Sequence, residues 1–453
     1  MAHESTRERE HWRGPVWVIG AVALVLFLWG LSPARRSPAE TATGAVELRV
    51  WSGWTGHEKD AFEGIVAAFN AEHPGVHLTN TTTAGDDTKV FRAITGGTPP
   101  DLFFIWNYEY IGALAQNGAV RCLDDSMRSA GLSDGMFVPA ALSQCRYEGR
   151  TYAMPYLSDV YALFLNRALL AEAGLDPDRP PRTLEELADT AERLTRYDES
   201  GDLVQMGIVP PDLFHLCFLM GGELYDEATH RVTADAPENV RALEYRCELL
   251  RRQGGVDKVD AFSAGFGEYA SSSQEFFAGK VAMVESGQWW PSFIEKFAKD
   301  LDYAVCPLPY PADRPDLAGT TILGGNFACI PRESPHPDLA FEFLRWTQTQ
   351  AAQAQFASAM HGVPNLRGML EIPELTGGSR ENEAFGVMCR IAGGPLATPF
   401  PTTPVNVLYV RELELAGDLA ARETKTAEEA LRGVATRVQR ELDECLQWRE
   451  AAP

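Results

Sequence analysis

The sequence predicts an α/β fold in which a largely parallel sheet carries helices on both faces and the chain divides into two lobes. From residue 46 onward, short runs of β-branched and aromatic residues alternate with amphipathic stretches, which is the pattern of parallel βαβ units. The chain has 453 residues, more than one hydrophobic core usually organises, so we expect two lobes of roughly 150 to 200 residues each.

The first 44 residues are expected to direct export. Val16–Leu31 is uncharged and almost wholly apolar, and three arginines precede it. As a helix it would be about 24 Å long, shorter than the roughly 30 Å hydrocarbon core, so it fits either a cleavable signal or a short membrane anchor. Ser32–Gly44 is rich in Pro, Ala, Thr and Ser and is typical of a flexible tether. Residues 1–44 therefore predict a protein on the periplasmic or extracellular side.

The first lobe is expected to begin with a βαβαβ unit. Its first helix carries apolar residues at i, i+3, i+4 and i+7, which predicts one buried face; they are Phe62, Ile65, Val66 and Phe69. The predicted elements are strands at Leu48–Trp51, Val76–Thr79 and Leu102–Ile105, with a second helix at Thr88–Ile94.

The second lobe repeats this alternation. A helix is predicted to start at Thr183, because Glu186 completes a capping box in which the two residues satisfy each other's free backbone N–H groups. The other predicted elements are strands at Val160–Asn166 and Val281–Val284, helices near Ala236–Arg252 and Ser272–Phe277, and a final helix capped by Thr426 with Glu429.

Two aromatic loops are expected to meet at one edge of the sheet. The loop WSGWTG, residues 51–56, follows the first strand, and Trp106 and Glu109 follow the third. Ligands of such sheets bind at the carboxyl ends of the strands, so both loops face one crevice. Within WSGWTG we expect Trp51 to anchor the loop and Trp54 to face the crevice; a packed Trp54 is the alternative.

The charge and the motifs argue against several function classes. The chain carries 63 acidic against 40 basic residues, a net charge of −23, which repels nucleic acid and anionic lipid. His57 and Glu58 begin a His-Glu-x-x-His zinc motif, but Ala61 stands where the second histidine belongs. The sequence has no nucleophile elbow, phosphate-binding loop or dinucleotide fingerprint. We expect no enzyme activity, no metal and no cofactor, with a glycosidase carboxylate pair as the alternative.

All eight cysteines follow the apolar segment, which fits an oxidising compartment and predicts disulfides. Cys306 and Cys329 flank two strand-like runs and are the first expected pair; Cys122 and Cys145 are the second. Eight free thiols are the alternative. Further candidate pairs are Cys217 with Cys247 and Cys389 with Cys445.

Short motifs recur along the chain in a characteristic order. They are His73-Pro74-Gly75, Gly96–Leu102 (GGTPPDL), Pro155–Asp159 (PYLSD) with Leu165-Asn166-Arg167, Pro181–Leu187 (PRTLEEL), and Phe277–Met283 (FAGKVAM) with Gly287-Gln288-Trp289. In this order and spacing they resemble the extracellular solute-binding proteins of bacterial ABC transporters, in the sugar-binding group that includes maltose-binding protein. The resemblance covers about residues 46–446.

The resemblance implies a two-lobed periplasmic-binding-protein fold of the Venus flytrap type (type II-like), in which the chain crosses a hinge three times. We expect crossings near Leu157–Val160, Ala304–Pro309 and Ile330–Pro337. The N-terminal lobe would then comprise residues 46–157 and 309–333, and the C-terminal lobe residues 160–303 and 337–450.

The resemblance also implies which residues bind a carbohydrate. The C–H face of a sugar stacks on an aromatic ring, while its hydroxyls need fixed polar groups. Trp289 resembles the family's stacking residue and Asp159 its ligand carboxylate; Trp290 is expected to pack. The alternative for each candidate is a packed or solvated role. The candidate ligand residues are Trp54, Thr55, Trp106, Asn107, Glu109, Tyr156, Asp159, Trp289, Gly325 and Asn326, with Asp86, Asp87, Phe214, His215, Phe400 and Asn406 as further candidates.

These features together predict a monomeric solute-binding protein. It would capture a carbohydrate, an oligosaccharide or related polyol, and deliver it to ABC permease subunits that work with a cytoplasmic ATPase. The alternatives are a sugar-sensing subunit held at the membrane by Val16–Leu31 and a carbohydrate-active enzyme.

Overall fold

The computed structural model describes residues 44–106, 109–267, 271–360, 362–371 and 379–451. The candidate export segment Val16–Leu31 and the candidate ligand residue Asn107 lie outside the described residues. Within the described ranges, no helix combines the length and the apolar character that crossing a bilayer requires.

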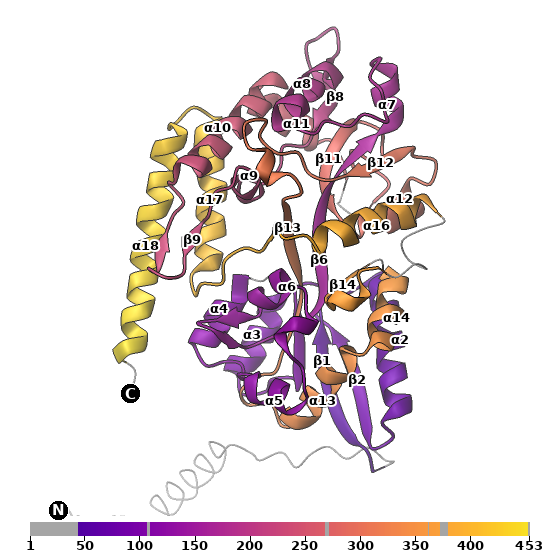
Figure 1. Cartoon of the computed structure of the whole chain (residues 1–453), viewed down its shortest axis with the longest axis vertical. Coiled ribbons are helices and arrows are strands. Elements are labelled where there is room, and N and C mark those ends of the chain that lie inside the picture. The colour runs from indigo at the N-terminus through magenta and orange to yellow at the C-terminus, as the bar shows by residue number, and fades with distance from the viewer. Residues whose placement is uncertain (1–43, 107–108, 268–270, 361, 372–378, 452–453) are drawn as a thin grey trace, which may run out of the picture.

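One sheet runs through both lobes, and the predicted α/β class is confirmed. The sheet is mixed and not largely parallel as predicted, because its two longest strands run antiparallel to each other and to most of their neighbours. Its strand order among the described residues is β2-β1-β3-β13-β6-β11-β8-β7. The long strands β6 (Met154–Asn166) and β13 (Thr321–Cys329) stand upright near the centre of Figure 1 and connect the two lobes. The other strands are β1 (Val46–Ser52), β2 (Val76–Thr82), β3 (Leu102–Ile105), β4 (Arg146–Tyr147), β5 (Arg150–Thr151), β7 (Arg196–Tyr197), β8 (Leu203–Ile208), β9 (Tyr225–Asp226), β10 (Arg231–Val232), β11 (Val281–Gly287), β12 (Tyr303–Cys306), β14 (Val363–Pro364) and β15 (Ala397–Thr398).

The N-terminal lobe begins with the predicted βαβαβ unit. Strand β1 pairs in parallel with β2 and with β3, and the predicted apolar stripe of the first helix is buried in the core of the lobe. The helices of this part are α2 (Gly56–Glu72), α3 (Asp87–Thr95), α4 (Glu109–Gln116), α5 (Asp124–Ser129) and α6 (Pro139–Gln144).

In the C-terminal lobe, β11 pairs in parallel with β8 and antiparallel with β6. The predicted capping box is present, because the Thr183 hydroxyl accepts the N–H of Glu186 at 3.2 Å and the Glu186 carboxylate accepts the N–H of Thr183 at 3.4 Å. The helices are α7 (Arg167–Glu172), α8 (Leu184–Leu194), α9 (Leu213–Leu219), α10 (Pro237–Arg252), α11 (Val256–Ser263), α12 (Trp290–Phe297), α16 (Arg380–Ala392), α17 (Asn406–Ala421) and α18 (Ala427–Ala451).

The helix predicted at Ser272–Phe277 is wrong, since the segment forms turns. The side-chain carbonyl of the buried Gln274 accepts the N–H groups of Phe276 and Phe277 at 2.8 and 3.1 Å. A side-chain acceptor of this kind offers the backbone an alternative to helical hydrogen bonds.

Strand β6, which contains the expected crossing Leu157–Val160, pairs with β13 along its N-terminal half and with β11 and β12 along its C-terminal half. The second passage lies in β13 rather than near residues 304–309, because β12 still pairs with the C-terminal half of β6. The third follows β14, since α13 (Pro337–Thr347) and α14 (Gln350–Met360) pack into the N-terminal core. Residues from 337 onward were expected in the C-terminal lobe, whereas both of these helices belong to the N-terminal lobe.

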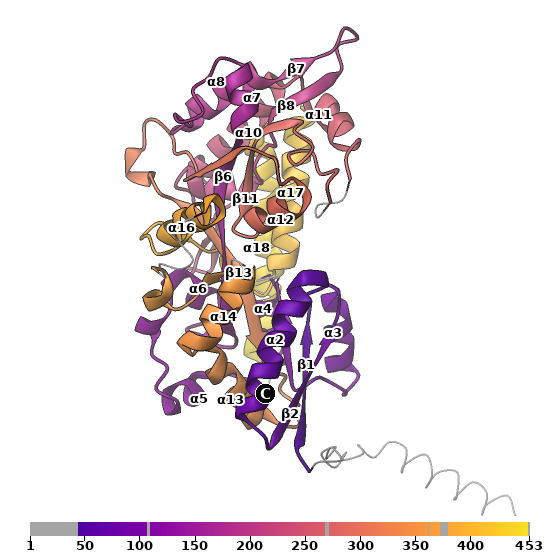
Figure 2. The ribbon, with the colours of Figure 1, turned by 90° about the vertical axis from the view of Figure 1, so that its right-hand side faces the viewer.

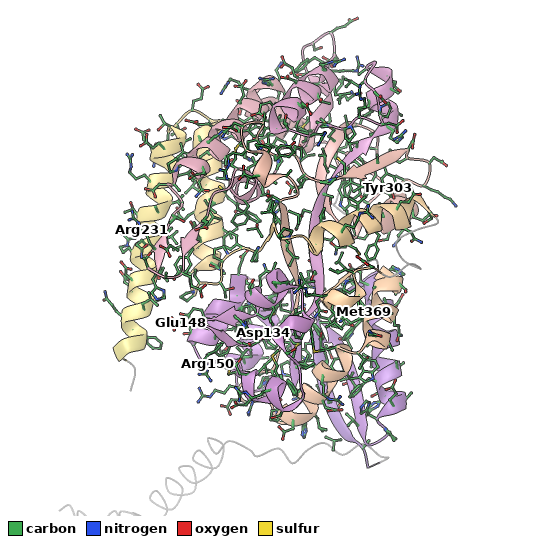
Figure 3. The ribbon with its side chains drawn as sticks, in the orientation of Figure 1. Asp134, Glu148, Arg150, Arg231, Tyr303 and Met369 are labelled. Carbon is green, nitrogen blue, oxygen red and sulfur yellow. The ribbon has the colours of Figure 1, made fainter. Side chains whose placement is uncertain are left out.

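A second contact joins the lobes beside α18. Gln116 of α4 donates through Nε2 to the carbonyl of Cys445 on α18 at 3.0 Å, and its Oε1 accepts the hydroxyl of Tyr147 at 2.8 Å. In Figure 3, Glu148 of the N-terminal lobe and Arg231 of the C-terminal lobe both lie on this side of the molecule. The hinge strands are therefore supplemented by a contact at the C-terminal helix.

All eight cysteines are described and are free thiols, so the expected disulfides are absent from this structure. Cys306 lies beside the C-terminal half of β6, whereas Cys329 lies past the N-terminal end of the same strand. The stretch of β6 between these two positions is about 30 Å long, which is too far for a disulfide. Cys122 hydrogen-bonds to a neighbouring carboxylate and Cys145 to a backbone carbonyl.

Candidate ligand-binding site

Trp106 forms an exposed platform on the N-terminal lobe. It follows β3, and its ring lies against the backbone of Gly53 and Gly85, where an added Cβ would approach ring atoms to 2.8 and 3.2 Å. These contacts favour glycine at both positions, which explains the first glycine of WSGWTG. The ring remains 37% exposed. An indole that rests on backbone and meets solvent is suited to stack on the C–H face of a sugar.

Trp54 lies in the core, so the prediction that it faces the crevice is wrong. It is 2% exposed and packs against Phe62, Phe104 and Phe356, with ring centroids 4.7, 5.1 and 5.5 Å away. Trp51, and not Trp54, is the half-buried tryptophan of this loop. Successive residues of a strand point to opposite faces of the sheet, and Trp51 points to the face opposite that of the fully buried residues of β1.

Tyr156 belongs to the same core. It is 1% exposed, its ring lies 5.8 Å from that of Trp54, and its hydroxyl has no hydrogen-bond partner among the described residues. It therefore packs beneath the first aromatic loop and is not placed to contact a ligand, as its candidacy had implied. Thr55 is exposed and precedes α2 without capping it, so it remains a candidate.

A carboxyl pair lies where the hinge meets the start of α2. Gln288 donates through Nε2 to Asp159 Oδ1 at 2.8 Å and accepts the backbone N–H of Val160 at 2.8 Å. Burial raises the pKa of Asp159 to about 6, although the bond from Gln288 favours the charged form. Burial and then the negative charge of Asp159 raise the pKa of Glu58 to about 7. Because like charges share this position, it favours a proton or a hydrogen-bond donor from a ligand.

Glu58 was not among the ligand candidates predicted from the sequence, where it was considered only as part of the incomplete zinc motif. The signal that could have identified it is its position in the first turn of the helix that follows the first aromatic loop. In both views α12 lies above α2 (Figure 1 and Figure 2). Gln288 directly precedes the segment that begins α12, so the carboxyl pair lies where elements of the two lobes meet.

Trp289 forms the corresponding platform on the C-terminal lobe. It follows β11, and its ring lies against Gly287, where an added Cβ would approach Cζ3 of the ring to 2.0 Å. The ring meets Tyr161 edge to face, with centroids 5.7 Å apart and planes at 89°. Trp289 is half-buried, whereas Trp290 is 1% exposed and packs as predicted.

Behind this platform lies a buried ion pair. His215 Nδ1 is 2.8 Å from Glu285 Oε1, and the two side chains are 4% and 5% exposed. Burial disfavours the charged imidazole, but the charge and hydrogen bond of Glu285 outweigh it and raise the pKa of His215. The His215 ring lies 4.6 Å from Tyr161 and 4.1 Å from Phe214. The pair fixes the imidazole and, through it, the rings beside Trp289.

Glu109 lies at the start of α4, near acidic groups of both lobes. Burial first, then the charges of Glu414 on α17 and Asp87 on α3, raise the pKa of Glu109. Asp86 of the same region caps α3, because its Oδ1 accepts the N–H of Thr88 at 3.1 Å. The structure thus brings Glu109 and Asp87 together and gives Asp86 a local structural role.

The hinge strand β13 places Gly325 and Asn326 beside β6. An added Cβ at Gly325 would approach the carbonyl oxygen of Leu157 to 2.5 Å, so close strand packing explains this glycine. Asn326 is 8% exposed, and its Oδ1 has no hydrogen-bond partner among the described residues. An unpaired buried acceptor is costly, so Asn326 remains a candidate to meet a ligand donor.

Two further candidates are structural. Phe400 is 1% exposed and packs 5.4 Å from Phe214. Asn406 is fully buried and braces the loop before α17, because its Nδ2 donates to the carbonyl of Pro401 at 2.6 Å and its Oδ1 accepts the hydroxyl of Thr403 at 2.5 Å. Both expectations of ligand contact are therefore wrong in this structure.

The contacts join the two platforms through the carboxyl pair. Trp106 rests on the loop that leads to Glu58, and the charge of Asp159 raises the pKa of Glu58. Asp159 in turn accepts a hydrogen bond from the residue before Trp289.

In the part of the chain that the structure describes, no group of three or more His, Cys, Asp or Glu side chains is placed to hold a metal ion.

Comparisons with known proteins relate this arrangement to one family. Residues 55–354 match the family model of bacterial extracellular solute-binding proteins. The chain is 23% identical over 342 residues to the maltotriose-binding protein of Pyrococcus abyssi, covering 74% of this chain and 70% of that protein. It is also 23% identical over 322 residues to the sn-glycerol-3-phosphate-binding periplasmic protein UgpB of Escherichia coli strain K12, covering 68% and 69%.

Solved structures show the same fold. CpMnBP1 with mannobiose bound is 25% identical, has a TM-score of 0.76, and the match covers 86% of this chain and 99% of that one. The sugar-binding protein MalE of Xanthomonas citri is 19% identical with a TM-score of 0.72, over 90% of this chain and 100% of that one. The two-lobed fold and the predicted family resemblance are therefore confirmed.

Proposed function

Because the chain belongs to the family of bacterial extracellular solute-binding proteins, we propose that it captures a carbohydrate between its two lobes and delivers it to an ABC permease. The ligand class is an oligosaccharide or related polyol. The names of the maltotriose-binding relative and of the mannobiose complex support this class.

The observation that carries the proposal is the pair of tryptophan platforms. Trp106 and Trp289 come from different lobes, each follows a strand, and each rests on glycine. The aromatic face of each ring can stack on the C–H face of a sugar, while Asp159 and Glu58 accept hydrogen bonds from its hydroxyls. Gln288 holds Asp159 in position for this role.

The charges disfavour an anionic ligand. A phosphate placed near Glu58, Asp159 or Glu109 would meet carboxylates, and bringing like charges together is unfavourable. The glycerol-phosphate specificity named for one relative is therefore not proposed for this chain. A neutral sugar, or one that carries a positive charge, suits the site better.

Ligand binding is proposed to act through closure of the lobes. Contacts to Trp106 and Trp289 would exist together only when the lobes approach, so the ligand would shift the population toward the closed form. A permease, with its cytoplasmic ATPase, would recognise that form and receive the ligand unchanged. The protein would work outside the cytoplasm, with Val16–Leu31 as its export signal or tether.

A thermal-shift screen tests the proposal. The purified protein is melted with neutral sugars, sugar phosphates, amino acids and peptides, and the recovered ligand is checked for chemical change. A ligand at a hundred times its Kd should stabilise the fold by about 2.7 kcal/mol. A shift with an intact neutral sugar supports the proposal. Stabilisation by another solute class alone, or cleavage of the sugar, contradicts it.

A further inference from the structure

Two polar side chains share one face of the hinge strands. In the antiparallel register of β6 and β13, Asp159 lies opposite Gly324 and Leu157 lies opposite Asn326. Residues two apart on a strand point to the same face, so Asp159 and Asn326 are diagonal neighbours on one face, roughly 7 to 8 Å apart. An added Cβ at Gly324 would lie 3.7 Å from Cβ of Asp159. The glycine therefore leaves the carboxyl without a side chain opposite it.

The acceptor groups at this face lack donors from the protein. Asn326 is 8% exposed, and its Oδ1 has no hydrogen-bond partner among the described residues. Asp159 accepts the bond from Gln288 through Oδ1, and within the described ranges no donor is placed at its Oδ2. Glu58 makes no hydrogen bond to any residue that the structure describes. Three acceptors are therefore available to a ligand.

The two carboxyl groups also lack a counter-ion. The negative charge of Asp159 acts on Glu58, and in the described part of the chain neither carboxyl forms an ion pair with an arginine or a lysine. Burial is the largest cause that raises the pKa of both groups, so the unliganded pair holds protons in place of a cation. Burying unpaired charge is costly, and a cationic ligand would relieve that cost.

The number and the chemistry of the acceptors select among cations. The described residues hold no group of three His, Cys, Asp or Glu side chains that suits a metal ion. A primary ammonium carries three N–H donors, which equals the number of available acceptors. Tyr161, two residues after Asp159 on β6, shares its face of the sheet and meets the ring of Trp289 edge to face. An aromatic platform therefore lies beside the acceptors, where it favours a cation as well as a sugar ring.

We propose that the carbohydrate is an amino sugar whose protonated amine binds Glu58, Asp159 and Asn326 while its ring stacks on Trp289. This inference rests on the proposed function and narrows the ligand from carbohydrates in general to those with a primary ammonium group. An N-acetylated amine is neutral and has one N–H donor, so it would satisfy one acceptor of the three. The charges that act on Glu109, from Glu414 and Asp87, add negative potential from both lobes that attracts a cation.

Calorimetric titration at about pH 6, where a primary amine is protonated, compares matched sugars. The probes are glucose, galactose and mannose with their amino and N-acetylamino forms, and cellotriose with the glucosamine and N-acetylglucosamine trimers of the same linkage. In at least one set, the amino form should bind about tenfold more tightly than both neutral partners. If the amino form binds no more tightly in any set, the inference is overturned.

The same titration in two buffers with different ionisation enthalpies counts protons. The amino sugar should release protons on binding, because its ammonium replaces those held by the pair of Glu58 and Asp159. The neutral partners lack a charge that would displace them. Tight binding of the amino form without proton release would place the amine elsewhere and would also overturn the inference.

Glu58→Gln keeps the size of the side chain and one acceptor but removes the charge. It should lower the ratio of amino-sugar to neutral-sugar affinity about fivefold or more. Asp60→Asn is the matched control, because it removes an exposed carboxylate from the same helix, and it should keep the ratio of the parent protein. A parental ratio in Glu58→Gln contradicts the inference.

The outcomes also separate the inference from the proposed function. Binding of neutral sugars without a preference for the amino form overturns the inference alone. Failure of every carbohydrate to bind overturns the proposed function as well.

Discussion

Trp106 and Trp289 both follow a strand and both rest on glycine, yet their surroundings differ. The N-terminal platform, Trp106 on Gly53 and Gly85, is 37% exposed and rests on loop backbone. The C-terminal platform, Trp289 on Gly287, is backed by Tyr161 and the buried His215–Glu285 pair. The C-terminal platform is therefore the more firmly held of the two.

This difference indicates an order of binding. A preorganised site loses less conformational entropy when it binds, so a sugar should bind first to the C-terminal platform. Closure would then bring the N-terminal platform into contact. The two tryptophans should consequently contribute unequally to affinity, and Trp54, which the sequence placed in the site, should contribute only to stability.

The largest expected effect is a loss of stability at Trp54, which distinguishes this core residue from the two platforms. Trp54→Ala removes a buried indole from contacts with Phe62, Phe104 and Phe356 and should lower the free energy of unfolding by about 3 to 5 kcal/mol. Urea denaturation measures the loss, with Trp51→Ala as the half-buried control. A denaturation midpoint close to that of the parent protein would show that Trp54 is not a core residue.

The next effect concerns the C-terminal platform. Trp289→Ala should weaken binding of a verified sugar by about 1 to 3 kcal/mol, because the stacking surface is lost, while the melting temperature changes little. Calorimetric titration measures the affinity, and Trp290→Ala serves as the contrasting variant that should damage the fold. Unchanged affinity in Trp289→Ala would remove this residue from the site.

A smaller loss of sugar affinity is expected when the N-terminal platform is removed. Trp106→Ala should cost about 1 kcal/mol of affinity for the same sugar, because this ring meets the ligand only after closure. Association and dissociation rates locate the effect: dissociation should become faster while association stays nearly constant. A loss larger than that of Trp289→Ala would reverse the proposed order of binding.

The smallest effect is the pH dependence of the carboxyl pair between the platforms. The pKa of Asp159 rises from 3.8 to about 6 and that of Glu58 from 4.5 to about 7, so the folded protein retains protons that the unfolded chain has released. The contribution of the pair to stability is therefore most favourable below about pH 4, where both carboxyls are protonated in the folded and the unfolded chain, and it declines as the pH rises through about 7. We expect about 1 kcal/mol, because both residues keep some contact with water.

Thermal melts of the unliganded protein between pH 5 and 8 measure the slope of stability against pH. Glu58→Gln should flatten it, whereas Asp60→Asn, an exposed carboxylate on the same helix, should leave it unchanged. An identical slope in the parent protein and in Glu58→Gln would show that the pair does not titrate in this range.

Local pattern predicted much of the scaffold. The buried face of α2, the capping box at Thr183 and the packed Trp290 follow from spacing and neighbouring residues. Such features depend on residues close in sequence.

Features that depend on distant partners were not predictable. Trp54 is buried because Phe356, from a helix near residue 350, covers it, and nothing near WSGWTG indicates this contact. The pKa of Glu58 is raised first by burial and then by the charge of Asp159, which lies about a hundred residues later in the chain. Likewise, α13 and α14 pack into the N-terminal core, although residues 337–450 were expected in the C-terminal lobe.

The ligand is proposed to lie between Trp106 and Trp289. A crystal structure of the protein with its tightest-binding sugar tests this position most directly. We expect one sugar unit stacked on Trp289, another part of the ligand against Trp106, and a hydroxyl bonded to Asp159, with Trp54 still buried. A sugar that contacts neither tryptophan platform would contradict the proposed position.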